Sequence, residues 1–135
     1  IFFSLGSNVK SSFISDEKLK LILSTFSKLK QRVIMKWDSE LINEKPENVL
    51  TGNWLPQDDI LAHPNIKLFI SHGGLGSIVE SKYHGVPIVG IPMFADQDVN
   101  VNEIVKEGWA IKLDINSITE ELLYWAINEA IYNDK

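Results

Sequence analysis

Short apolar runs alternate with longer amphipathic stretches along the whole chain, and this alternation restricts the possible folds more than any other feature. Most of the runs are continuously apolar rather than alternating, which is typical of strands covered on both faces of a parallel sheet. We expect strands at residues 1–5, 32–37, 48–51, 67–71, 88–91 and 110–113.

The stretches between these runs have helical spacing. After Ser15 and Asp16, which can cap a helix start, apolar residues recur every three or four positions through Leu29. Further helices are expected at 58–62, 77–84 and 97–106. The last one begins with the capping-box pattern at 117–120. Its expected apolar face consists of Leu122, Leu123, Ala126, Ile127 and Ile131. Repeated strand-helix units predict an α/β fold, a Rossmann-like doubly wound parallel sheet that binds its ligand at the carboxyl ends of the strands.

The composition of the chain excludes several kinds of binding site and partner. The chain has 135 residues, 44% of them hydrophobic, which suits one domain rather than two. A net charge of -5 without a basic stripe argues against a nucleic-acid partner. The absence of cysteine excludes disulfides and zinc-cysteine sites. Because the chain opens inside an apolar run, we expect residues 1–135 to be one soluble domain cut from a longer chain.

A glycine-rich turn, residues 71–77, lies between a predicted strand and a predicted helix. Glycines let the backbone approach a ligand, and the amides at a helix start attract an anion, so a phosphate fits here. His72 and the Ser77 hydroxyl are candidate additional donors. Glycines alone favour a phosphate site and an ordinary tight turn about equally. The turn does not match the dinucleotide fingerprint, because the third glycine is missing and the preceding strand is not the first.

Four further residues in three segments are candidates for ligand contact, and each segment has a structural alternative. Trp54 stands in a polar loop, where its ring can stack on a base or fold back onto the core. Glu80 lies one turn beyond the glycines, where it can face a ribose or be an ordinary surface residue. Asp96 and Gln97 follow a strand and can bind sugar hydroxyls, while Asp96 also suits a helix N-cap. His63 and His84 stand at element ends and are taken as structural.

Taken together, these segments resemble the signature of the UDP-glycosyltransferases, family-1 glycosyltransferases of the GT-B fold. The resemblance rests on Trp-Leu-Pro-Gln at 54–57, His-Gly-Gly-x-Gly-Ser-x-x-Glu at 72–80, His-Gly-Val-Pro at 84–87, Gly-Ile-Pro at 90–92 and Ala-Asp-Gln at 95–97. Phe-Ser-Leu-Gly-Ser-Asn at 3–8 looks like the first strand and loop of the family's C-terminal domain, and is most like the arthropod branch. The chain therefore resembles one GT-B half-domain, the C-terminal UDP-sugar-binding domain.

The resemblance implies a role for each candidate residue. Trp54 would stack on the uracil, the Leu55 backbone would pair with its polar edge, and Gln57 would reach the ribose region. Glu80 would hold the ribose hydroxyls. The diphosphate would be held by Ser7, His72, Ser77 and the amides near Gly74 and Gly76. Asp96 and Gln97 would hold the transferred sugar. The chain departs from the common pattern at Gly76, where Asn is frequent, and at Lys36, near a frequent Arg.

Family membership would imply inverting transfer of a hexose to a small lipophilic acceptor, as in detoxification, with UDP-glucose as the expected donor. The catalytic His and Asp would lie in an N-terminal domain, so no catalytic residue, cofactor or metal is expected in this chain, which alone would be inactive. The parent enzyme would be anchored in the endoplasmic reticulum membrane, facing the lumen. Two alternatives remain: a binding module without catalysis, and another nucleotide-sugar enzyme such as an NAD-dependent epimerase, which the missing Tyr-x-x-x-Lys pair disfavours.

Overall fold

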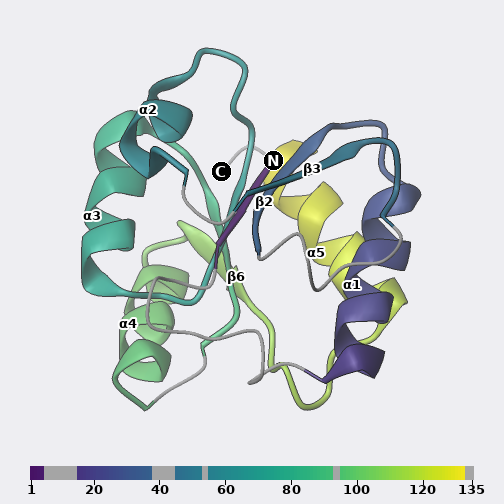
Figure 1. Ribbon diagram of the computed structural model, residues 1–135. Coiled ribbons are helices and arrows are strands. Elements are labelled where there is room, and N and C mark those ends of the chain that lie inside the picture. Colours follow the sequence, from purple (N-terminus) through teal and green to yellow (C-terminus); the bar gives the residue numbers. More distant parts are fainter. Residues whose placement is uncertain (5–14, 38–44, 53–54, 93–94, 133–135) are drawn as a thin grey trace.

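A parallel six-stranded sheet forms the centre of the molecule (Figure 1). The computed structural model describes residues 1–4, 15–37, 45–52, 55–92 and 95–132, without the side chains of residues 16, 95 and 96. The strands are β1 (Phe2–Ser4), β2 (Val33–Lys36), β3 (Val49–Gly52), β4 (Phe69–Ser71), β5 (Ile88–Gly90) and β6 (Ala110–Lys112). Their order is β3-β2-β1-β4-β5-β6, which confirms the predicted doubly wound sheet.

Helices cover both faces of this sheet. They are α1 (Asp16–Ser27), α2 (Gln57–Ala62), α3 (Leu75–His84), α4 (Ala95–Lys106) and α5 (Glu120–Tyr132). Helices α1 and α5 pack side by side on one face, while α2, α3 and α4 lie on the other (Figure 1). Neighbouring parallel strands are joined by long crossover connections, usually helices, and right-handed crossovers on either side of β1 place helices on both faces of the sheet.

The core is divided by the sheet, because successive side chains of a strand point to opposite faces. Phe3 packs with the residues beneath α1 and α5, and its ring meets Phe26 edge-on at 5.8 Å between centroids. Phe2 packs on the other side, stacked against Phe69 at 5.2 Å. All four rings are fully buried, and each contributes about 1.5–3 kcal/mol to folding. These rings fix the central strands β1 and β4, between which the candidate site lies.

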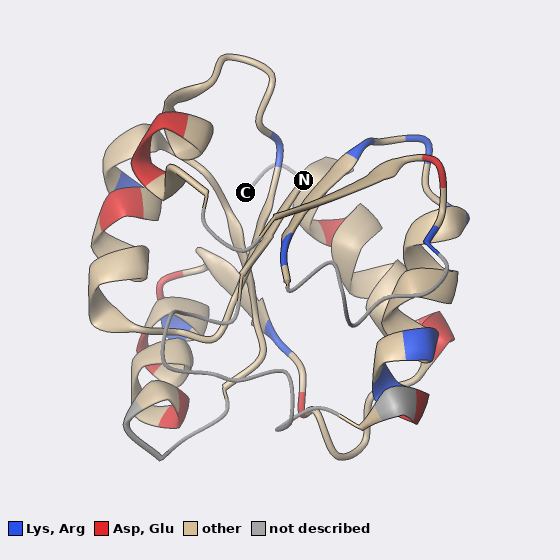
Figure 2. Cartoon of the chain, viewed as in Figure 1, with Lys and Arg blue, Asp and Glu red and all other residues tan. Residues whose placement is uncertain are grey.

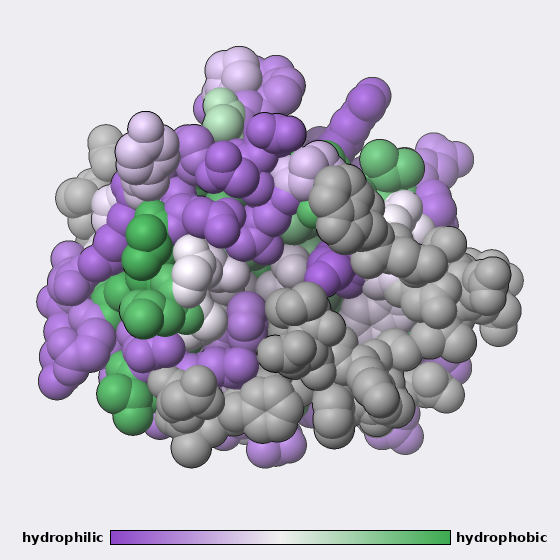
Figure 3. All heavy atoms as spheres, turned by 60° about the vertical axis from the view of Figure 1, so that its left-hand side comes forward, coloured by the Kyte–Doolittle hydropathy of each residue, from purple (hydrophilic) through white to green (hydrophobic). Residues whose placement is uncertain are grey.

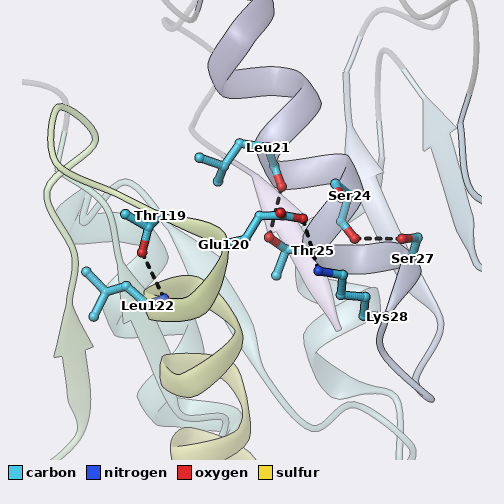
Figure 4. A network of polar contacts seen from close by, with 8 residues as sticks. All are labelled: Leu21, Ser24, Thr25, Ser27, Lys28, Thr119, Glu120 and Leu122. Atoms are coloured by element: carbon cyan, nitrogen blue, oxygen red, sulfur yellow. Dashed lines mark hydrogen bonds and ion pairs between the residues drawn. The ribbon is translucent and has the colours of Figure 1, made fainter.

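Two helix starts are set by hydroxyl caps. The Ser15 hydroxyl accepts from the Lys18 amide at 3.2 Å and begins α1, as predicted. For α5 the prediction of a capping box at 117–120 is wrong: the Thr119 hydroxyl accepts from the Leu122 amide at 3.1 Å, and the helix begins at Glu120 (Figure 4). Starting the helix after Thr119 lets Ile118 enter the core beneath α1 and α5.

Three other helix starts differ from the prediction, and the strands are mostly a residue or two shorter at their ends. Helix α2 begins at Gln57, one residue early. Helix α3 begins at Leu75 rather than residue 77, because Gly74 is extended and serves as the N-cap. Helix α4 begins at Ala95 rather than residue 97, so Asp96 lies inside the helix and the alternative of Asp96 as its N-cap is wrong. On α5, Leu122 is exposed, although Leu123, Ala126 and Ile127 are buried as predicted.

The surface of the described residues is mostly hydrophilic. Lysines and arginines are scattered rather than gathered on one face (Figure 2). Apolar patches interrupt the polar surface on the side of α2, α3 and α4 (Figure 3). The exposed apolar residues of α3 and α4 include Leu75, Val79 and Val99. Among the described residues, no helix is both long and apolar enough to cross a membrane.

Candidate functional site

The order in which strands are added to the sheet reverses between β1 and β4, the two central strands, which are parallel to each other. One half of the sheet is built outward from β1 to β3, and the other from β4 to β6. Ser4 and Ser71 are register partners at the carboxyl ends of β1 and β4, and both are buried. Ligands of open parallel sheets bind at such a switch point, outside the carboxyl ends of the strands. The glycine-rich turn leaves the sheet at this point.

Gly73 shapes the turn. Its φ of 91° lies in the left-handed region that favours glycine. A side chain here would collide with Val101 Cγ2 and would lie 3.1 Å from the Gln97 carbonyl oxygen on α4. The Gly73 amide donates to the Ser71 hydroxyl oxygen at 3.1 Å in the buried interior. The turn is therefore held tightly between β4 and α4.

Gly74 brings His72 to the start of α3. A Cβ on Gly74 would lie 2.6 Å from the His72 Nε2 atom, so the imidazole lies directly against the glycine backbone. Gly74 is the N-cap of α3, and no described side chain caps this helix. The amides of the first turn are thus available to a ligand, and the helix dipole adds about 0.3–1 kcal/mol for an anion. Both features suit a phosphate group.

Gln57, Ser77 and Glu80 come together beside this helix start. The Gln57 amide nitrogen donates to the Ser77 hydroxyl at 3.1 Å and to the Glu80 carboxylate at 3.3 Å. Ser77 and Glu80 are one turn apart on α3, and Gln57 is the first residue of α2, so helix packing creates the cluster. All three side chains are partly exposed. The cluster offers a carboxylate, an amide and a hydroxyl to one polar ligand.

The remaining candidates have varied surroundings. Gly76 is exposed and a Cβ there would meet no atom within 4 Å, so this position has room for the Asn that is common in the family. The Leu55 side chain packs on the core beneath α2. Gln97 is buried in α4, one turn before Val101, which packs on Gly73. Ser7, Trp54 and the Asp96 side chain lie outside the described residues, so their roles stay predictions.

Sequence reasoning missed Ser71 and Asn100, which bind the turn rather than face a ligand. Ser71 accepts from Gly73, and the Asn100 amide donates to the Gly73 carbonyl at 3.1 Å. The only sequence signal for Asn100 is its place one helical turn after Gln97. His63 accepts from the Asn65 amide, and His84 at the end of α3 contacts Asp58 of α2 at 2.9 Å. Among the described residues, no group of three or more potential ligands is placed to hold a metal.

Comparison with known proteins decides the family. The model of the family "UDP-glucoronosyl and UDP-glucosyl transferase" matches residues 1–135. The chain belongs to this family. It is 44% identical over 135 residues to UDP-glycosyltransferase UGT5 of the insect Dactylopius coccus, covering all of this chain and 26% of that protein. It is 38% identical to UDP-glucuronosyltransferase 2B1 of Rattus norvegicus, covering 99% of this chain and 25% of that protein.

Solved glycosyltransferase structures share the fold of this UDP-glycosyltransferase chain. The glycotransferase of kitacinnamycin superimposes with a TM-score of 0.85 at 29% identity, over 98% of this chain and 34% of that one. A UDP-glucosyltransferase from Polygonum tinctorium superimposes with a TM-score of 0.81 at 23% identity, over 98% of this chain and 33% of the other. These neighbours have the GT-B fold, and the chain spans about a quarter of the length of its curated relatives.

Proposed function

We propose that this chain binds the UDP-sugar donor of a UDP-glycosyltransferase, as the C-terminal half of a GT-B enzyme. The observation that carries the proposal is the cluster of Gln57, Ser77 and Glu80 beside an uncapped helix start at the β1/β4 switch point. A nucleoside diphosphate needs an anion site and a hydroxyl site within a few ångströms of each other. Residues one turn apart at the start of α3 provide this combination.

The donor lies across the carboxyl edge in this proposal. The first-turn amides of α3, the Ser77 hydroxyl and His72 bind the diphosphate, with Ser7 from the loop after β1. Glu80 accepts from the ribose hydroxyls, and Gln57, which donates to Glu80, orients that carboxylate. Trp54 and the Leu55 backbone bind the uracil, and Asp96 and Gln97 bind the sugar. Family membership supports these assignments, and the geometry around α3 supports those of His72, Ser77, Glu80 and Gln57.

The reaction we propose is direct displacement with inversion at the anomeric carbon. An acceptor hydroxyl loses its proton to a histidine, oriented by an aspartate, and its oxygen forms the new bond as the bond to UDP breaks. Both of those residues lie in a second domain in this proposal, so this chain alone transfers nothing. His72 and the α3 amides stabilise the negative charge that develops on the departing diphosphate. No metal takes part.

The wider assignments are proposals that family membership supports. The acceptor is a small lipophilic alcohol or phenol, bound mainly by the second domain, and the donor is UDP-glucose. The complete enzyme works at the endoplasmic reticulum membrane, on the lumenal side, in detoxification. The 44% identity to an insect UDP-glycosyltransferase supports the arthropod type.

The proposal is tested by ribose discrimination. Isothermal titration should show that the chain binds UDP with micromolar or poorer affinity and prefers UDP to its 2′-deoxy analogue. Charge-assisted hydrogen bonds contribute roughly 1.5–3 kcal/mol, so Glu80→Ala should weaken UDP binding about 10- to 100-fold and reduce the preference. Glu103→Ala, which removes an exposed carboxylate from α4, is the matched control and should bind as wild type does. Undiminished discrimination by Glu80→Ala would contradict the ribose site.

A further inference from the structure

Side chains hold both polar groups of Gly73. Its N–H donates to the Ser71 hydroxyl at 3.1 Å, and its C=O accepts from the Asn100 Nδ2 group at 3.1 Å. Ser71 belongs to β4 and Asn100 to α4, so the turn is tied to a strand and to a helix. The Asn100 contact is partly buried, which shields it from competition with water.

Residues of α4 also pack directly against Gly73, on the side of the turn where Asn100 lies. The space where a Gly73 side chain would stand is filled by Val101 and by the Gln97 carbonyl oxygen, both from α4. Val101 also lies over β5, because a Cβ on Gly90 would be only 2.7 Å from its Cγ1 atom. Helix α4 is therefore fixed against both the sheet and the turn, and Asn100 has a fixed base from which to bind Gly73.

The direction of the Gly73 carbonyl decides where the next amide points. A peptide group is planar and trans, so the Gly73 C=O and the Gly74 N–H point in opposite directions. Asn100 holds the carbonyl toward α4, and this directs the Gly74 N–H away from α4. Because two glycines flank this peptide, rotating the whole group costs little steric energy. Without Asn100, the carbonyl oxygen is free to turn toward a bound anion.

We propose that Asn100 is a positioning residue, which aims the Gly74 N–H at the donor's diphosphate by holding the Gly73 carbonyl against α4. This inference rests on the proposed function, since the diphosphate is its ligand. Asn100 acts through the backbone of the turn and does not itself touch the donor. The same contact ties α4, which also carries Gln97, to the glycine-rich turn.

The test compares two substitutions of Asn100 across pH, with UDP as the probe and isothermal titration as the measurement. Asn100→Ala removes the donor and should weaken UDP binding about tenfold at every pH. Asn100→Asp should be at least as weak at pH 8, where a carboxylate faces the Gly73 oxygen. As the pH falls to 4, close to the ordinary aspartate pKa of about 3.9, about half of the carboxyl groups are protonated and regain an O–H donor. Asn100→Asp should therefore come to bind more tightly than Asn100→Ala at pH 4. Dividing by the wild-type affinity at each pH removes the titration of UDP itself.

A matched control separates geometry from charge. Asn102→Asp introduces the same charge on the same helix at an exposed position that contacts Asp98 and Lys112, and should bind UDP as wild type does. Melting temperatures show whether each variant is folded. Equal affinities of Asn100→Ala and Asn100→Asp at pH 4 would overturn the inference, as would wild-type affinity in Asn100→Ala.

Failure of the proposed function gives a different result. If the wild-type chain does not bind UDP, the proposed function fails. The contact between Asn100 and the Gly73 carbonyl can then still be tested by the backbone amide resonance of Gly74. The ¹⁵N–¹H resonance of Gly74 should move in Asn100→Ala and return toward its wild-type position in Asn100→Asp at low pH. A Gly74 resonance that is the same in wild type and both variants would overturn the contact itself.

Discussion

At the scale of single residues, the two glycines at the start of α3 have opposite surroundings. Gly74 lies against the His72 ring, and a Cβ at this position would stand only 2.6 Å from Nε2. Gly76 faces open space within the first turn of α3. Gly74 is thus needed for the close approach of the His72 ring to the backbone, whereas a glycine at position 76 only lowers the stability of the helix.

Alanine at these two positions should therefore act in opposite ways. Gly76→Ala should raise the free energy of unfolding by about 0.5–1 kcal/mol, because alanine favours the helix and restricts the unfolded chain. UDP affinity should not change. Gly74→Ala should displace His72 and weaken UDP binding several-fold. Thermal unfolding and isothermal titration of both variants check this, and a Gly74→Ala chain that binds as wild type does would show that His72 is not held by this contact.

At the scale of elements, α5 is joined to α1 by a polar contact at its first turn. Glu120 lies 3.5 Å from the Lys28 ammonium, close to Ser24 (Figure 4). A hydrogen bond from Ser24 lowers the pKa of Glu120, and the Lys28 charge lowers it further, while partial desolvation opposes both. This contact lies next to the Thr119 cap and supports the packing of the two helices.

The lowered pKa predicts how stability depends on acidity. A carboxyl group with a lower pKa in the folded state stabilises the protein above its unfolded pKa of about 4.3. This contribution disappears as the pH falls through the folded-state pKa. Melting temperatures measured from pH 7 to pH 3 should therefore fall less steeply for Glu120→Gln than for wild type. Glu121→Gln, its exposed neighbour in the same turn, should follow the wild-type curve, and identical curves for all three would contradict the contact.

Periodicity predicted the elements better than their ends. The sheet and its helices were predictable because β1, β4 and β5 are short runs buried on both faces, and the edge strands β3 and β6, although partly exposed, are also short and rich in apolar residues. The start of α5 was not, since Ser117 and Thr119 are both good caps and only the burial of Ile118 favours the second. Asn100 could not be told from Asn102 by sequence, because both are polar positions on one amphipathic helix. Packing against Gly73 distinguishes them.

At the scale of the whole molecule, folding brings Lys112 to the helix that carries Asp96. The sequence offers no cation near residues 92–102, which is the basis for expecting a neutral sugar. In the folded chain, Lys112 at the end of β6 forms an ion pair with Asp98 and donates to Asn102 at 3.1 Å. Its charge is thus already matched by Asp98, and a sugar carboxylate near Asp96 would meet a like charge.

We therefore expect UDP-glucose to be preferred to UDP-glucuronic acid. Two like charges 4 Å apart cost about 4 kcal/mol at an effective dielectric constant of 20. The chain should bind UDP-glucose more tightly in competition titrations, and the complete enzyme should transfer glucose faster to a phenol. Faster turnover with UDP-glucuronic acid would contradict this donor assignment. Lys112→Met should leave the preference unchanged, because Lys112 serves Asp98.

The central claim is that the donor binds at the carboxyl edge of the sheet, where β1 and β4 meet. Backbone amide resonances of the ¹⁵N-labelled chain, recorded during titration with UDP, test it most directly. We predict saturable shifts in the amides of Leu55, Gln57 and residues 72–80, with little change around Gly85 and Gly108 at the opposite edge. Shifts centred on that opposite edge, or none at millimolar UDP, would contradict the account.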